Sequence, residues 1–205
     1  MELEFSGKDI ILKDKELNSL DKKVIKLVNL IDFEYVIISG YVAILFGRSR
    51  ATEDVDMFIR VGKEEFYAFY DRISKNNFYI INAENKEEGY EFLKEGIALR
   101  IAENGEFIPN FELKLPKREI DRLTMKNKIK VKFSNFEINT SEIELQIAFK
   151  LFLGSEKDYL DSKHLYNTFE NYLDKKKLYQ YIKLLGVNMN VAERILRLKP
   201  GEFNG

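Results

Sequence analysis

Residues 38–59, ISGYVAILFGRSRATEDVDMFI, hold the pattern that decides the fold. A β-branched and aromatic run at residues 35–38 predicts a strand, and Ser39 and Gly40 end it. The apolar residues 42–46 then predict a short helix, and residues 54–61, DVDMFIRV, alternate as a second strand does. The stretch therefore predicts a strand, a turn, a helix and another strand in direct succession.

The second of these strands carries two aspartates, Asp54 and Asp56, at alternate positions. Side chains two residues apart on a strand point to the same face, so the two carboxylates face the same way. Carboxylate oxygens are preferred ligands of hard cations such as Mg²⁺, and pairs of such ions clamp the attacking and leaving oxygens in phosphoryl transfer. Asp54 and Asp56 are therefore expected to be catalytic and to bind Mg²⁺ or Mn²⁺.

The residues that precede this strand suit a triphosphate. Small residues at Ser39 and Gly40 let the backbone approach phosphates closely, and the N-terminus of the following helix presents free amides to anions. Arg48 and Arg50, in the loop before Asp54, can pair with phosphates through two hydrogen bonds. Ser39, Gly40 and Arg50 are the expected nucleotide-binding residues of this region.

The rest of the chain divides into a mixed part and a helical part. Up to residue 140, further elements alternate: helices at 17–31 and 63–75, strands at 78–81, 97–102 and 107–115, and an extended segment at 128–138. From Ser141 the periodicity is helical, with helices expected at 142–153, 157–172, 175–185 and 191–198. Ser141 and Glu144 have the spacing of a capping box at the first of them. The prediction is an α+β fold: a mixed α/β core at 1–140 and a helical C-terminal subdomain at 141–205.

Composition excludes several classes of site. The 205 residues include 33 basic and 34 acidic side chains, so the net charge of -1 provides no global field for nucleic acid, and an RNA site must be a local patch. The absence of cysteine excludes disulfides, thiolate zinc sites and cysteine nucleophiles. No apolar run approaches the roughly 18 residues of a membrane span. The expected location is the cytoplasm, with no membrane partner.

A pair of small residues, followed after about a dozen residues by Asp-hydrophobic-Asp, resembles the fingerprint of the polymerase-beta-like nucleotidyltransferase superfamily. The resemblance extends to its AbiEii-like branch of toxin-type transferases, because Gly47, Arg50, Thr52, Asp54 and Asp56 stand where that branch has them. Ser39-Gly40 departs slightly from the usual Gly-Gly or Gly-Ser. The fold expected from the resemblance is the nucleotidyltransferase mixed sheet with flanking helices.

A second match lies in the helical tail, SEIELQIAFKLFLGSEKDYLDSKHLY. The AbiEii-like branch has there a glutamate-led helix with a lysine, then Lys-Asp and a further aspartate; the corresponding residues are Glu142, Lys150, Lys157, Asp158 and Asp161. The resemblance implies that Lys150 contacts the nucleotide and that Asp158 acts on the acceptor as a catalytic residue.

The superfamily also implies a third metal-binding carboxylate on a later strand. Glu112 is one candidate, because charged and apolar residues alternate in NFELKL at 110–115. Glu103, at the end of the preceding predicted strand, is the other. Neither stands in the usual hydrophobic-Asp-hydrophobic pattern, so Glu112, Glu103 and no third ligand are all left open.

These features predict an enzyme: a metal-dependent nucleotidyltransferase that moves a nucleotide from a nucleoside triphosphate to an acceptor hydroxyl. A tRNA end, another RNA or a protein hydroxyl could each be the acceptor, and the resemblance favours RNA. For a toxin of a toxin-antitoxin pair, the resemblance also implies an antitoxin protein as partner. The alternative is a catalytically degenerate module with the same fold that binds nucleotide or another protein. The irregular pattern around the third carboxylate favours this alternative.

Overall fold

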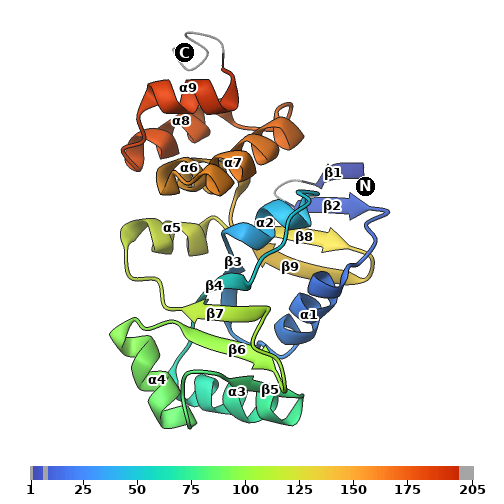
Figure 1. Ribbon diagram of the computed structural model, residues 1–205, viewed down its shortest axis with the longest axis vertical. Coiled ribbons are helices and arrows are strands. Elements are labelled where there is room, and N and C mark those ends of the chain that lie inside the picture. Colours follow the sequence, from blue (N-terminus) through green and yellow to red (C-terminus); the bar gives the residue numbers. More distant parts are fainter. Residues whose placement is uncertain (1, 7–8, 199–205) are drawn as a thin grey trace. The chain divides into compact units, whose positions relative to one another are not determined.

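A computed structural model describes residues 2–6 and 9–198 (Figure 1). The chain forms two compact units: Met1–Tyr41 with Ala51–Thr140, and Val42–Arg50 with Ser141–Gly205. In the described residues, no helix is both long enough and apolar enough to cross a membrane. Helix α2 (Gly40–Leu45) begins in the first unit and ends in the second.

In the described residues, the first unit is built on one mixed sheet with the strand order β1-β2-β8-β9-β3-β4-β7-β6-β5. The strands are β1 (Glu2–Ser6), β2 (Asp9–Lys13), β3 (Glu34–Ile37), β4 (Asp54–Arg60), β5 (Phe78–Ile80), β6 (Leu99–Glu103), β7 (Asn110–Lys114), β8 (Ile129–Phe133) and β9 (Phe136–Thr140). The centre of the sheet carries the predicted motif, because β4 pairs antiparallel with β3 and parallel with β7.

Strand β4 is anchored by its apolar residues. Val55, Met57 and Ile59 are completely buried, whereas Asp54 and Asp56 are only partly buried. Phe58 is also buried and packs in a cluster with Val36, Ile38 and Met125. Burial of these apolar side chains stabilises the unit and fixes which way the two aspartates point.

The helices of the first unit are α1 (Ser19–Val28), α3 (Lys63–Lys75), α4 (Lys86–Glu95) and α5 (Glu119–Lys126). Local signals define their ends. Asn18 and Asp21 form a capping box at α1, and the Asn85 side chain accepts a hydrogen bond from the Glu88 amide at the start of α4. Gly96 ends α4 with a φ of 89°, a left-handed conformation in which a side chain would be strained.

The second unit contains α6 (Ile143–Leu153), α7 (Glu156–Phe169), α8 (Lys175–Leu184) and α9 (Met189–Leu196). Residues 42–50 pack with these helices: the Phe46 ring meets the Phe169 ring edge to face at 4.8 Å, and a ring nitrogen of His164 lies 3.0 Å from the Phe46 carbonyl oxygen. The sequence assigned residues 42–50 to the core at 1–140, whereas they associate with the helices in the structure.

The predicted mixed α/β class is confirmed, but several local predictions differ from the structure. The start of the chain, for which no helix or strand was predicted, contains the antiparallel pair β1 and β2. The extended segment at 128–138 is two antiparallel strands, β8 and β9. Helices α4 and α5 were not predicted at all.

The predicted capping box at Ser141 and Glu144 was wrong. Helix α6 begins one residue later than expected, with Glu142 at its N-cap, and the Glu142 side chain accepts no capping hydrogen bond from the first amides of the helix. Ser141 Oγ instead donates to Gln146 Oε1 at 2.9 Å. Glu144 Oε1 accepts from the Asp174 amide at 2.9 Å, so it connects α6 to the start of α8.

Candidate functional site

The predicted carboxylates of β4 and β7 come together through the parallel pairing of these strands. Asp56 is the direct neighbour of Glu112, and Asp54 is the neighbour of Asn110. The side chains of Asp56 and Glu112 are 17% and 14% exposed, so both are partly withdrawn from water. The two strands therefore bring one residue of the aspartate pair beside the candidate third carboxylate.

The other candidate, Glu103, lies at a different place. Strand β6 is separated from β4 by β7, and Glu103 pairs with Phe78 of β5. Its carboxylate is held by Lys26 at 2.6 Å and Lys23 at 3.5 Å. The hydrogen bond from Lys26 is the main cause of a lowered pKa for Glu103. Of the two alternatives, Glu112 has the position that suits a third ligand.

Lys114 lies between the carboxylates of Asp56 and Glu112, a position that sequence reasoning missed. Its Nζ is 2.7 Å from Asp56 Oδ1 and 2.8 Å from Glu112 Oε2. Burial lowers the pKa of Lys114, but the two carboxylates outweigh burial and the pKa is raised overall. The sequence did contain a signal for Lys114: it stands two residues after Glu112, so its side chain lies on the same side of the strand.

The Glu112 carboxylate is also held by Arg100, whose Nε lies 3.1 Å from Glu112 Oε1. Burial raises the pKa of Glu112, but the hydrogen bond from Lys114 and the charges of Lys114 and Arg100 lower it overall. Glu112 is thus kept ionised, as a cation ligand has to be.

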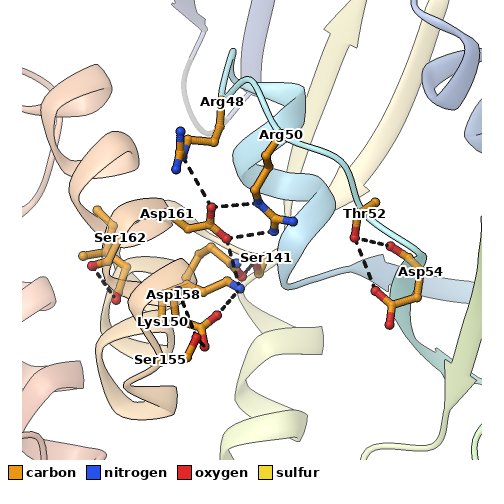
Figure 2. Close-up of polar contacts among 12 residues, drawn as sticks. Arg48, Arg50, Thr52, Asp54, Ser141, Lys150, Ser155, Asp158, Asp161 and Ser162 are labelled. Atoms are coloured by element: carbon orange, nitrogen blue, oxygen red, sulfur yellow. Dashed lines mark hydrogen bonds and ion pairs between the residues drawn. The ribbon is translucent and has the colours of Figure 1, made fainter.

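Thr52 positions Asp54 (Figure 2). Thr52 Oγ1 donates to the Asp54 carbonyl oxygen at 3.0 Å and lies 3.4 Å from Asp54 Oδ1. A hydroxyl two residues before the aspartate therefore orients both its backbone and its carboxylate. This contact gives a physical role to Thr52, which the family resemblance had singled out only by its place in the motif.

Ser39 and Gly40 form the turn between β3 and α2. Ser39 has a φ of 62°, a left-handed conformation that is uncommon outside glycine, and Gly40 begins the helix. The amide of Ile38, the preceding residue, donates to the Asp56 carbonyl oxygen at 2.9 Å. The turn, which the sequence predicts to contact phosphates, therefore begins beside the backbone of Asp56.

In the second unit, Asp161 is the centre of a network of ion pairs (Figure 2). Arg50 Nε and Nη2 each lie 2.9 Å from one of its carboxylate oxygens. Lys150 Nζ lies 3.2 Å from Asp161 Oδ2, and Arg48 Nε lies 3.7 Å from Asp161 Oδ1. Asp161 is completely buried, so the network ties the loop at 48–50 to α6 and α7.

Asp158 and Lys150 belong to the same network. Lys150 Nζ donates to Asp158 Oδ1 at 2.6 Å, and Ser155 Oγ donates to Asp158 Oδ2 at 2.6 Å. Burial raises the pKa of Asp158, but these hydrogen bonds and the charge of Lys150 lower it overall. The predicted residues Arg50, Lys150 and Asp158 are thus gathered together, with Lys150 only 2% exposed.

The donor set on β4 and β7 fits a hard divalent cation, because Asp54, Asp56 and Glu112 offer only carboxylate oxygens. These carboxylates do not, however, form a preformed coordination site. Within residues 2–6 and 9–198, no three His, Cys, Asp or Glu side chains converge into a group that could hold a metal ion. The Lys114 ammonium provides the positive charge between Asp56 and Glu112. A cation that binds Asp56 Oδ1 and Glu112 Oε2 competes with that ammonium.

No protein-family model matches this chain, and no curated protein matches its sequence. Among solved structures, an antigenic nucleotidyltransferase-like protein from Paracoccidioides brasiliensis is similar, with a TM-score of 0.52 and 16% sequence identity; the match covers 87% of this chain and 92% of that one. JHP933 from Helicobacter pylori matches with a TM-score of 0.45 and 14% identity, over 87% of this chain and 83% of that one. The similarity to the first protein shows a nucleotidyltransferase-like fold and, at this identity, the fold alone.

Proposed function

We propose that this chain is a metal-dependent nucleotidyltransferase that transfers a nucleotide from a nucleoside triphosphate to an acceptor hydroxyl. The observation that carries the proposal is the pairing of Asp56 with Glu112 across two parallel strands. Asp54 stands at the start of the same strand as Asp56, in a fold similar to that of a nucleotidyltransferase-like protein. Three acidic side chains at this place in such a fold suit the binding of a metal-bound triphosphate.

In this proposal Asp54, Asp56 and Glu112 hold Mg²⁺ or Mn²⁺, which when bound supplies positive charge to the triphosphate. Thr52 keeps the Asp54 carboxylate oriented through its contact at 3.4 Å. The backbone at Ser39 and Gly40 approaches the phosphates without the bulk of large side chains. These groups act by position and charge, which are the main contributions of a protein to phosphoryl transfer.

The transfer itself forms one bond and breaks one. The acceptor hydroxyl oxygen bonds to the α-phosphorus, the bond from that phosphorus to the bridging oxygen breaks, and pyrophosphate leaves with the electron pair. The hydroxyl proton passes to a base. From the resemblance we propose Asp158 for that role, and nucleotide contacts for Arg50 and Lys150. Each of them would first have to exchange its present partner for substrate, because all three are ion-paired within the second unit.

The acceptor is proposed on the resemblance alone. We infer RNA, with tRNA as one form of it, and for a toxin-type enzyme a neutralising antitoxin protein. The near-balance of 33 basic and 34 acidic residues means that an RNA acceptor would have to bind to a local patch rather than to the whole surface.

The test is transfer of label from each of the four α-labelled nucleoside triphosphates, with Mg²⁺ and with or without total RNA. The matched controls are Asp54→Asn and Asp56→Asn, which keep the shape of the side chain and remove its charge. Label that reaches RNA or protein only with the parent chain supports the proposal and identifies the nucleotide and the acceptor class. Equal labelling by the parent and by folded Asp56→Asn protein would contradict it.

A second candidate is the degenerate module that binds nucleotide without turnover. The observation in its favour is Lys114, whose ammonium already neutralises Asp56 and Glu112. Under this alternative, the parent chain binds nucleoside triphosphate in calorimetry and transfers no label to any acceptor. Under the first proposal, binding and transfer are both lost when Asp56 is replaced by asparagine.

A further inference from the structure

The loop between β6 and β7 presents two large apolar side chains to solvent. Phe107 is 70% exposed and Ile108 is 60% exposed. Phenylalanine and isoleucine are among the residues most often buried, and contiguous exposed apolar side chains, unlike single ones, are a feature of binding sites.

The backbone that carries these side chains is held firmly. The Asn104 amide donates to the Asn77 carbonyl oxygen at 3.0 Å, and the Tyr79 hydroxyl donates to the Glu106 carbonyl oxygen at 2.9 Å. Asn110 Nδ2 lies 3.4 Å from the Phe107 carbonyl oxygen. The backbone of the loop is therefore fixed by hydrogen bonds, which reduces the entropy lost when a ligand stacks on the Phe107 ring.

The loop leads directly to the candidate metal site. Its last hydrogen bond runs from the Asn110 amide to the Glu53 carbonyl oxygen at 3.0 Å, and Asn110 is the strand neighbour of Asp54. Phe107 precedes Asn110 by three residues, which span at most about 10 Å. A ligand whose phosphates lie at Asp54 therefore has an aromatic side chain on a hydrogen-bonded loop within reach.

The chemistry of the loop suits the uncharged end of such a ligand. Glu106 precedes Phe107 and is ion-paired with Lys23, which also lies 3.5 Å from Glu103. Because the Glu106 carboxylate and the Lys23 ammonium neutralise each other, this pair provides no net charge to attract a phosphate group, and a neutral ring needs none. Aromatic side chains stack on nucleobases of any identity, because every base has a π-face.

We infer that Phe107, supported by Ile108, is the stacking platform for the base of the nucleoside triphosphate. The inference rests on the proposed function, since it takes the phosphates to lie at Asp54 and Asp56. Stacking on Phe107 holds the base at one end of the ligand while the carboxylates hold the other end through the cation. Because stacking does not read base edges, the platform adds affinity for every nucleoside triphosphate.

The absence of tryptophan from the chain allows a direct test. The substitution Phe107→Trp introduces a single tryptophan at the platform, and its fluorescence reports stacking of a base. The matched control is Ile97→Trp, which also replaces an exposed apolar residue in the same unit. Ile97 precedes β6, whose first residue pairs with Leu113, so it lies at the opposite end of β7 from Phe107.

Both variants are titrated with each nucleoside triphosphate, with inorganic tripolyphosphate and with a short single-stranded RNA, all in the presence of Mg²⁺. The expected result is a fluorescence change with nucleoside triphosphates in Phe107→Trp only, and none with tripolyphosphate. Equal changes in both variants, an equal effect of tripolyphosphate, or a response to RNA alone would overturn the inference.

Calorimetry separates failure of the platform from failure of the proposed function. Phe107→Ala is expected to bind nucleoside triphosphate about tenfold more weakly than the parent and to bind tripolyphosphate equally well. If the parent binds nucleotide, Asp54→Asn does not, and Phe107→Ala binds like the parent, the platform is wrong while the proposed function stands. If the parent binds no nucleotide, both are wrong.

Discussion

Replacing Lys114 by methionine tests whether its ammonium competes with a divalent cation. The substitution keeps an unbranched side chain and removes the charge that lies 2.7 Å from Asp56 and 2.8 Å from Glu112. The carboxylates then have no cation between them. We expect Lys114→Met to bind Mn²⁺ more tightly than the parent when no nucleotide is present.

The size of the effect follows from the geometry. Two unit charges about 4 Å apart interact by about 4 kcal/mol at an effective dielectric constant of about 20. The Lys114 side chain is 35% exposed, and solvent reduces such a pair to about 1 kcal/mol. Release of two pairs therefore favours the metal by about 2 kcal/mol, which corresponds to an affinity gain of roughly 30-fold.

The assay is a titration with Mn²⁺ in which electron paramagnetic resonance measures the free ion. The control is Lys94→Met, because Lys94 is ion-paired with Glu91 on the surface of the same unit and touches none of the three candidate ligands. Urea unfolding of each variant checks that the chain is folded. If the parent, Lys94→Met and Lys114→Met all bound Mn²⁺ with the same affinity, competition between the Lys114 ammonium and the metal ion would be refuted.

Three further predictions concern stability, each measured by urea unfolding. Asp161→Asn should lower the free energy of unfolding by about 3 kcal/mol, because Arg50 and Lys150 lose a buried partner; a loss below about 1 kcal/mol would argue against a buried network. In the folded chain the pKa of Asp158 lies below its ordinary value of 3.8. Its contribution to the free energy of unfolding is therefore complete above that pH and is lost as the pH falls through the folded pKa. The stability advantage of the parent over Asp158→Asn should therefore shrink below pH 3.8, and a gap that stays constant down to about pH 3 would contradict this. Ser39→Val should be less stable than Ser39→Gly by about 2 kcal/mol, since a β-branched residue is strained at a φ of 62°; equal stability of the two variants would count against strain at the turn.

Local patterns carried most of what the sequence predicted correctly. The alternation in DVDMFIR was enough to place Val55, Met57 and Ile59 in the core and to put both aspartates on the other side. Helical periodicity after Ser141 indicated the four helices α6 to α9 to within a few residues at each end. These elements were predictable because each contains enough apolar residues, spaced at the period of a strand or of a helix.

Elements with few apolar residues were missed. Helix α4 buries only Gly89 and Leu93, so KEEGYEFLKE shows little apolar periodicity. Strand β2 is short and buries only Ile10 and Leu12, so its local signal is weak and no strand was predicted there. Both elements depend on tertiary packing rather than on a strong local signal.

The contacts that define the candidate site are non-local, and this limited the prediction most. Nothing in the order of the residues states that β4 is the parallel neighbour of β7, so Lys114 had no visible partner at Asp56, 58 residues away. The pairing of Arg50 with Asp161 joins residues 111 positions apart. Sequence reasoning identified both residues of that pair through the family resemblance, but it did not predict that they bind each other.

The measurement that tests the central claim most directly is a crystal structure with Mn²⁺ and a non-hydrolysable nucleoside triphosphate, with data collected for the anomalous signal of manganese. We predict an anomalous peak bonded to carboxylate oxygens of Asp54 and Asp56, with the Lys114 ammonium moved away from Asp56. A structure with nucleotide bound and no manganese at either aspartate would contradict the claim that these residues hold the metal for nucleotide transfer.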